Sequence, residues 1–416
     1  MSTAVNDRDD SEVTAKRRSG WLGPGLLISA SFIGPGTVTT ATATGASYGF
    51  ALTWAIVFSI VATIILQEMS ARLGLMGGLS TGEAMRETFE SPVAKLLMIA
   101  LIVTAIGIGG AAYAGGDTTG TALALSDVTG LSIPVLSCII VAVIVVLLLT
   151  GSYKVIEKFM TALVIILALI FLITAVAVKP DLGAMFKGIF VPGLPDGSVL
   201  TAIALIGTTV VPYNVFLHSN LVQEKWGDEP GELSLKKARV DNVVSISIGG
   251  LITLAIVATA ASTLFAQGIA AESAAELAEP LRPVLGDFAP WALAIGLFAA
   301  GLTSAIAGPL GAAYAISGVL GWSSDLKDIK FRAIYLAVVL IGLVIAVTGI
   351  NPIQVIVLAQ AANGILLPVV AFFMLYTMNN KKLLGDNANG LASNLLGGFI
   401  FLVTVVLGGY SLYSLF

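Results

Sequence analysis

The chain has 416 residues, of which 57% are hydrophobic and only 11% are charged. A soluble domain of this size needs far more charge to cover its exterior, so the composition excludes a soluble globular protein and predicts an all-α membrane protein. The single cysteine excludes an internal disulfide and a four-cysteine metal cluster. The net charge of −4, with basic residues confined to short loops, gives no reason to expect a nucleic-acid partner.

Residues 1–20 form a polar segment with several basic residues and no apolar core followed by a cleavage site, so we expect a cytoplasmic N-terminal tail. Beyond it, apolar windows of about 20 residues predict eleven membrane-spanning helices. They lie at residues 21–47, 50–74, 95–125, 133–151, 155–178, 199–224, 240–268, 288–320, 331–350, 352–378 and 391–415. Most basic residues then fall on the side of the N-terminus, which predicts a multi-pass plasma-membrane protein with a cytoplasmic N-terminus and an external C-terminus.

The first and the sixth predicted spans contain a proline where the chain should be at mid-membrane, in residues 31–37 and 208–214. Interruptions of a helix expose peptide groups that hydrocarbon cannot satisfy, so they persist only where those groups face a cavity or a bound solute. Corresponding breaks in two halves of a chain are typical of inverted-repeat transporters. We therefore expect two inverted five-helix repeats, residues 21–178 and 199–378, with an additional helix at 391–415. Both breaks should face a shared, water-accessible pocket.

Four phrases of the sequence resemble one family. They are Gly23-Pro24-Gly25 leading to Gly34-Pro35-Gly36-Thr37, then Ser70-Ala71-Arg72-Leu73-Gly74, then Pro212-Tyr213-Asn214-Val215-Phe216-Leu217-His218-Ser219, and finally Val357-Leu358-Ala359-Gln360. Together they resemble the NRAMP metal-ion transporters, which share the LeuT-type fold, and the resemblance runs through nearly all of the first ten predicted helices. It implies a LeuT-type 5+5 inverted repeat with helices 1 and 6 broken, and secondary transport by alternating access.

The sequence departs from the family pattern at the residues that would ligate a metal. The family has Asp-Pro-Gly-Asn in the first break, where this chain has Gly34-Pro35-Gly36-Thr37. A methionine of the sixth helix is replaced by Val211, which removes the sulfur that selects softer ions such as manganese and iron. In the third helix only Asp117 of an Asp/Glu pair is retained, whereas Gln360 matches a tenth-helix glutamine that approaches the metal.

Neutral oxygens remain as the expected site. The candidate substrate-binding residues are Gly34, Gly36, Thr37, Thr208, Val211, Tyr213, Asn214, Gln360 and Asn363. The metal ligands are unassigned, with a weak site at Thr37, Thr208 and Gln360 as one arrangement. Such a ring suits a hard, partly hydrated cation such as magnesium. It suits a small polar solute equally well, and the helix N-termini after the breaks favour an anion. A passive channel or a sensor on the same scaffold is a further alternative.

Two ionisable residues are candidates for a coupling or proton pathway. Asp117 is an intramembrane carboxylate, and such groups usually line a pathway or a relay. His218, the only histidine, has a side chain whose ordinary pKa near 6.5 suits proton transfer. Glu68 and Arg72, four residues apart, should instead form an ion pair at the cytoplasmic end of the second span. We expect no enzyme activity and no cofactor. The expected partners are a small ion or polar solute, a coupling proton or cation, and the lipid bilayer.

Overall fold

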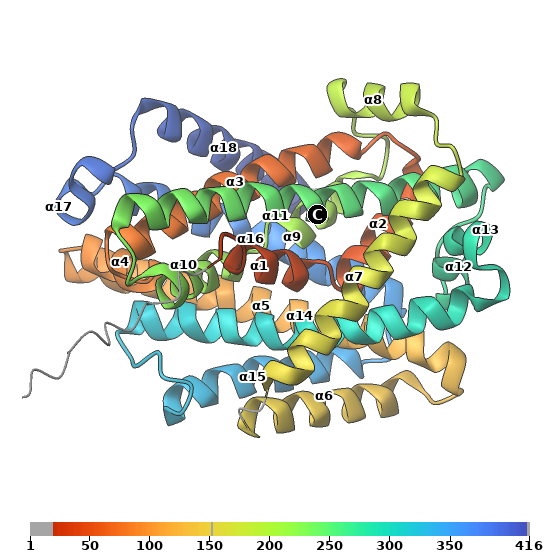
Figure 1. Cartoon of the computed structure of the whole chain (residues 1–416), viewed down its shortest axis with the longest axis horizontal. Coiled ribbons are helices and arrows are strands. Elements are labelled where there is room, and N and C mark those ends of the chain that lie inside the picture. Colours follow the sequence, from red (N-terminus) through yellow and green to blue (C-terminus); the bar gives the residue numbers. More distant parts are fainter. Residues whose placement is uncertain (1–19, 151–152, 414–416) are drawn as a thin grey trace, which may run out of the picture.

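The computed structural model describes residues 20–150 and 153–413, and within these residues every regular element is a helix (Figure 1). The α-helices are α1 (Pro24–Phe32), α2 (Pro35–Tyr48), α3 (Thr53–Met76), α4 (Thr81–Thr88), α5 (Pro92–Thr129), α6 (Ile133–Thr150), α7 (Tyr153–Ala177), α8 (Leu182–Phe190), α9 (Val199–Thr209), α10 (Pro212–Trp226), α11 (Gly231–Ala260), α12 (Ala274–Ala278), α13 (Arg282–Leu285), α14 (Ala289–Leu320), α15 (Ile329–Ala346), α16 (Pro352–Met378), α17 (Lys381–Leu384) and α18 (Leu391–Tyr413). A π-helical turn, Ala261–Phe265, extends α11.

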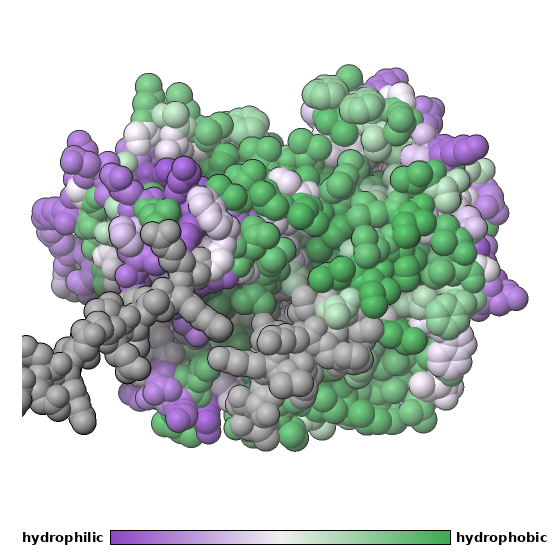
Figure 2. Space-filling view, in the orientation of Figure 1, coloured by the Kyte–Doolittle hydropathy of each residue, from purple (hydrophilic) through white to green (hydrophobic). Residues whose placement is uncertain are grey.

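Eight helices of the described chain are long and apolar enough to cross a membrane, and the number rises to 10 if two bent helix pairs each count as one span. The all-helical membrane architecture is therefore confirmed. The predicted total of eleven also needs the shorter apolar helix Ile133–Leu149, and it stays a prediction. On the face shown in Figure 2, hydrophilic residues gather at two opposite ends and apolar residues lie between them, as a bilayer requires.

Short helices at these ends were not predicted, because windows of span length do not detect them. α4 begins at a capping box: the Ser80 hydroxyl accepts from the Glu83 N–H, and the Glu83 carboxylate accepts from the Ser80 N–H at 2.9 Å. α8 is capped by Asp181, which accepts from the Ala184 N–H at 2.9 Å. α4 and α17 lie at one end of the molecule, and α8, α12 and α13 lie at the other (Figure 1).

The two predicted interruptions occupy equivalent positions in two helix pairs. α1 ends at Phe32 and α2 starts at Pro35, with a bend of 56° between their axes. α9 ends at Thr209 and α10 starts at Pro212. The residue that ends each first helix has nearly the same backbone geometry, with φ −80° and ψ 65° at Ile33 and φ −90° and ψ 71° at Val210. An extended residue then precedes a proline, whose missing N–H suits the first position of a helix.

A buried carboxylate holds the beginning of α1. Asp241 of α11 accepts hydrogen bonds from the N–H groups of Gly23, at 3.0 Å, and Gly25, at 2.6 Å. The first N–H groups of a helix have no partner within that helix, and an anion near them also interacts favourably with the helix dipole. Ser29 donates to the Ser245 carbonyl at 2.7 Å one helical turn farther along α11. These hydrogen bonds therefore hold α1, which ends at the first break, against α11.

We expect Asp241→Ala to lower the apparent unfolding temperature of the purified protein by several degrees. The substitution leaves the buried N–H of Gly25 and the half-buried N–H of Gly23 without this acceptor, and a buried group without a partner costs on the order of 1–3 kcal/mol. Thermal unfolding in detergent measures the change. Asp127→Ala is the control, because Asp127 is exposed near the end of α5. An Asp241→Ala protein as stable as the control would contradict the importance of this contact.

Candidate functional site

Asp117 lies at the first break although it comes from α5. Its side chain is fully buried, and its Oδ1 accepts a hydrogen bond from the Gly36 N–H, in the first turn of α2, at 3.2 Å. Its Oδ2 accepts from the hydroxyl of Ser304 of α14. The carboxylate therefore sits against the positive end of the α2 dipole, which favours its charged form electrostatically. The acceptor at this helix N-terminus is supplied by the protein itself.

The two glycines of the break make room for this arrangement. A Cβ atom at position 34 would lie 3.0 Å from the Ser304 Oγ and 3.2 Å from the Asp117 Oδ1. A Cβ at position 36 would overlap the side-chain nitrogen of Gln360 and lie 3.2 Å from the same carboxylate oxygen. Backbone, carboxylate and amide thus meet where any larger residue would separate them.

The carbonyl groups at the end of α1 are satisfied by hydroxyl groups. The Ser304 hydroxyl lies 2.8 Å from the Ser31 carbonyl oxygen, which the Tyr113 hydroxyl also approaches at 3.4 Å. Thr37 donates to the Phe32 carbonyl across the break. Bare peptide groups at membrane depth need such partners. The break is therefore closed by side chains from α2, α5 and α14.

The side-chain amides of Gln360 and Asn363 are buried without hydrogen-bond partners among the described residues. This holds for both the oxygen and the nitrogen of each amide, and the side chains are at most 1% exposed. A buried polar group without a partner costs about 1–3 kcal/mol, so four such atoms on one face of α16 need an explanation. Gln360 approaches Gly36 of the break, and Asn363 approaches Gly109 of α5.

Threonine and asparagine side chains connect the two breaks. The hydroxyls of Thr37 and Thr208 are 2.6 Å apart, and because Thr37 donates its only proton to the Phe32 carbonyl, Thr208 donates to Thr37. The Ser31 hydroxyl lies 3.1 Å from the Oδ1 of Asn214 in the first turn of α10. The structure therefore brings together Thr37, Thr208 and Asn214, as the sequence predicts, and places the Gln360 amide at the neighbouring Gly36.

Two predicted residues of the second break serve packing. Val211 lies in the main hydrophobic core. Tyr213 meets Tyr113 edge to face with 5.4 Å between ring centroids, and Gly311 of α14 approaches its ring. The aromatic pair joins α5, α10 and α14 beside the carboxylate of Asp117.

The expectation of a water-accessible pocket is wrong for the conformation described. Every candidate substrate-binding residue and Asp117 is buried, with polar side chains at most 1% exposed. The physical reason is that hydroxyl groups satisfy the freed carbonyls of Ser31 and Phe32, so side chains of the protein can pack around the first break. The site is enclosed.

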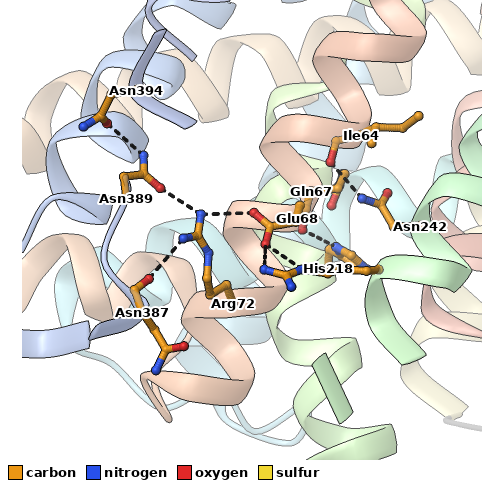
Figure 3. A network of polar contacts seen from close by, with 10 residues as sticks. Ile64, Gln67, Glu68, Arg72, His218, Asn242, Asn387, Asn389 and Asn394 are labelled. Carbon is orange, nitrogen blue, oxygen red and sulfur yellow. Dashed lines mark hydrogen bonds and ion pairs between the residues drawn. The ribbon is translucent and has the colours of Figure 1, made fainter. Parts of the chain in front are cut away.

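His218 lies apart from the break, at the contact between α10 and α3. Its Nδ1 is 3.1 Å from the Gln67 carbonyl oxygen (Figure 3). A carbonyl only accepts, so Nδ1 must carry the proton, and Nε2 then holds a free lone pair. Nε2 is buried and has no partner among the residues that the structure describes. A buried nitrogen in this state can accept a proton.

The ion pair predicted between Glu68 and Arg72 is confirmed, with 3.1 Å between Arg72 Nη2 and Glu68 Oε2. Figure 3 shows how this pair extends into a larger network beside His218. Arg239 of α11 binds the other oxygen of Glu68 at 2.7 Å. Arg72 also donates to the Asn389 side chain at 2.8 Å, which ties α3 to the segment before α18.

Sequence reasoning missed Ser304, Ser31 and Tyr113. Ser304 lies in a run of small residues that predicts close helix packing, and that packing is present: a Cβ at Gly301 would overlap the Thr121 hydroxyl of α5. A serine within an otherwise apolar span was the available signal for a second role. The spatial neighbour that gives it this role, Asp117, comes from residues far away in the sequence.

This arrangement offers oxygen ligands. One carboxylate, two threonine hydroxyls and two unpaired amides surround the breaks, and no group of three or more His, Cys, Asp or Glu side chains positioned for a metal occurs in residues 20–150 and 153–413. Oxygen donors of this kind suit hard cations rather than soft ones.

Comparisons with known proteins agree in assigning the chain. Residues 25–414 match the family described as natural resistance-associated macrophage protein-like. A divalent metal cation transporter, MntH, from Yersinia pestis (strain Pestoides F) is 29% identical over 405 residues, which cover 95% of each protein.

Solved structures show the same fold. A manganese transporter from Eremococcus coleocola superposes with a TM-score of 0.74 at 18% identity, covering 95% of this chain and 86% of that chain. A nucleobase-cation-symport-1 family transporter in a closed conformation gives a TM-score of 0.55 at 16% identity, covering 94% of this chain and 92% of that chain. The chain belongs to the NRAMP family.

Proposed function

We propose that this protein is a secondary transporter that carries a divalent metal cation across a membrane by alternating access. The observation that carries the proposal is the meeting of the Asp117 carboxylate and the unpaired Gln360 amide at the first break. A carboxylate oxygen is a ligand that hard divalent cations accept, and so is the oxygen of the Gln360 amide, whose nitrogen faces Gly36 in this conformation. The relatives that are named as divalent metal cation and manganese transporters support the same class of substrate.

The charge at the break argues against an anionic solute. The Gly36 N–H, which such a solute would bind at the N-terminus of α2, already donates to Asp117. A second negative charge beside a buried carboxylate would be repelled strongly at low dielectric. The N-terminus of this half-helix is thus already occupied by an anion of the protein.

Among divalent cations, we propose a preference for a hard ion such as magnesium. Val211 supplies no sulfur donor, and the remaining polar side chains at the breaks are oxygen and nitrogen groups of Thr, Asn, Gln and Asp. Magnesium keeps several water molecules and needs few direct protein ligands. Thr37, Thr208 and Gln360 then bind the hydrated ion beside Asp117.

We further propose that the described conformation is an occluded state of two inverted repeats, residues 21–178 and 199–378, with the helix at 391–415 outside them. The matching backbone geometry of Ile33 and Val210 supports the repeat, and the burial of the site supports occlusion. In this proposal the protein lies in the plasma membrane with a cytoplasmic N-terminus. Asp117 and His218 serve the coupling of transport to a proton or cation.

Metal preference is tested by thermal stabilisation, because a ligand that binds only the folded form raises apparent stability. We expect magnesium to stabilise the purified protein at concentrations where manganese has little effect. Both metals are added as chloride salts so that the anion is the same in each measurement. A panel of small anions then tests the alternative solute. Clear stabilisation by micromolar manganese would contradict the proposed preference, and stabilisation by an anion alone would contradict cation transport.

We expect Asp117→Asn to reduce magnesium uptake into liposomes by at least about tenfold, because it removes the carboxylate charge from the break while keeping its shape. The readout is the initial rate with and without an opposing gradient, which also separates coupled transport from passive flux. Asp127→Asn is the control, since Asp127 is an exposed residue of the same helix. Uptake by Asp117→Asn at the normal rate would remove this residue from the mechanism.

We expect His218→Gln to flatten the dependence of uptake rate on pH, because it removes the only histidine of the chain. Glutamine can still donate to the Gln67 carbonyl but cannot take up a proton. The measurement is uptake rate against pH together with acidification reported by an internal dye. An unchanged pH profile would exclude His218 from proton transfer.

A further inference from the structure

A site made of oxygen ligands must distinguish magnesium from calcium if it is to be selective. Calcium and magnesium are both hard cations that oxygen atoms bind, so ligand type alone does not separate them. They differ in coordination number: calcium takes six to eight oxygens and often both oxygens of one carboxylate, whereas magnesium takes six ligands in an octahedron and keeps water. A site can therefore reject calcium by limiting the number of protein oxygens that reach the ion.

Ser304 limits that number at two places. Its hydroxyl contacts the Asp117 Oδ2 and lies 2.8 Å from the Ser31 carbonyl oxygen. The single hydroxyl proton can be donated to either oxygen, and an ionised carboxylate makes the stronger bond. Both oxygens therefore face the serine, while Oδ1 of Asp117 faces Gly36 and remains the carboxylate oxygen on the side of Gln360.

The position of Ser304 is fixed by packing. It is fully buried, and Gly301, one turn earlier in α14, lets that helix approach Thr121 of α5 closely. Thr121 in turn donates to the Asp117 backbone carbonyl at 2.8 Å. A side chain at position 34 would press against Ser304, so Gly34 leaves the hydroxyl in place. The close approach of α14 to α5 therefore keeps the Ser304 backbone beside Asp117.

We infer that Ser304 is a positioning residue that excludes calcium by holding the Asp117 carboxylate in one-oxygen contact with the transported cation. This inference rests on the proposed function and extends it, because it names the group that sets selectivity between two hard cations. Removing the hydroxyl frees Oδ2 of Asp117, whereas the Ser31 carbonyl keeps its contact with the Tyr113 hydroxyl. The carboxylate can then offer both of its oxygens to one ion, which is the change that favours calcium.

The test compares dissociation constants for calcium and magnesium, each measured with the metal alone by thermal stabilisation of purified protein. We expect the wild-type protein to prefer magnesium. We expect Ser304→Ala to shift the ratio of the two constants toward calcium on the order of tenfold, the scale of one charge-assisted hydrogen bond. Ser317→Ala is the matched control, because Ser317 is a buried serine of the same helix whose hydroxyl has no partner among the described residues.

A second variant keeps the test informative if Ser304→Ala does not fold. Ser304→Cys retains the size of the side chain but donates weakly, so we expect a smaller shift in the same direction. A folded Ser304→Ala protein with the wild-type ratio, or an equal shift in Ser317→Ala, overturns the inference while leaving the proposed function intact. A wild-type protein that binds no divalent cation overturns the proposed function itself.

Discussion

The need to satisfy peptide groups at membrane depth governs this structure. Each of the two breaks frees N–H and C=O groups that neither lipid nor a continuous helix can pair. At the first break the Asp117 carboxylate accepts a hydrogen bond from the N–H of Gly36, and hydroxyl groups contact the carbonyls of Ser31 and Phe32. Because the partners come from different helices, the break joins α2, α5 and α14 into one site.

The same partners give the site its chemistry. Asp117 occupies the N-terminus of α2, so the positive end of this helix favours a buried negative charge instead of an anionic substrate. The unpaired amide of Gln360 lies against the same glycine. In the proposed function, a cation at this site meets one carboxylate and several neutral oxygens. The proposed selectivity then depends on how many of those oxygens already accept hydrogen bonds from protein hydroxyls.

Hydrogen bonds and ion pairs connect the helices of the site to one polar end of the molecule. Asp241 of α11 binds the start of α1, the helix that ends at the first break. Arg72 joins α3 to the segment before α18, and Glu68 joins α3 to α11. His218 lies between these contacts and the second break on α10. A change at the break therefore has direct mechanical partners at the polar end of the helix bundle.

The sequence by itself determined the all-helical membrane architecture and the approximate limits of the long helices, because hydropathy acts locally. It also singled out Asp117, Thr37, Thr208 and Gln360 as candidates, since polar residues in apolar spans stand out, and their role in transport stays a prediction. It could not assign Ser304 to the site or show that the site residues are fully buried in this conformation. Those outcomes depend on contacts between residues far apart in the sequence. The packing of α14 against α5 at Gly301 is what places Ser304 beside Asp117.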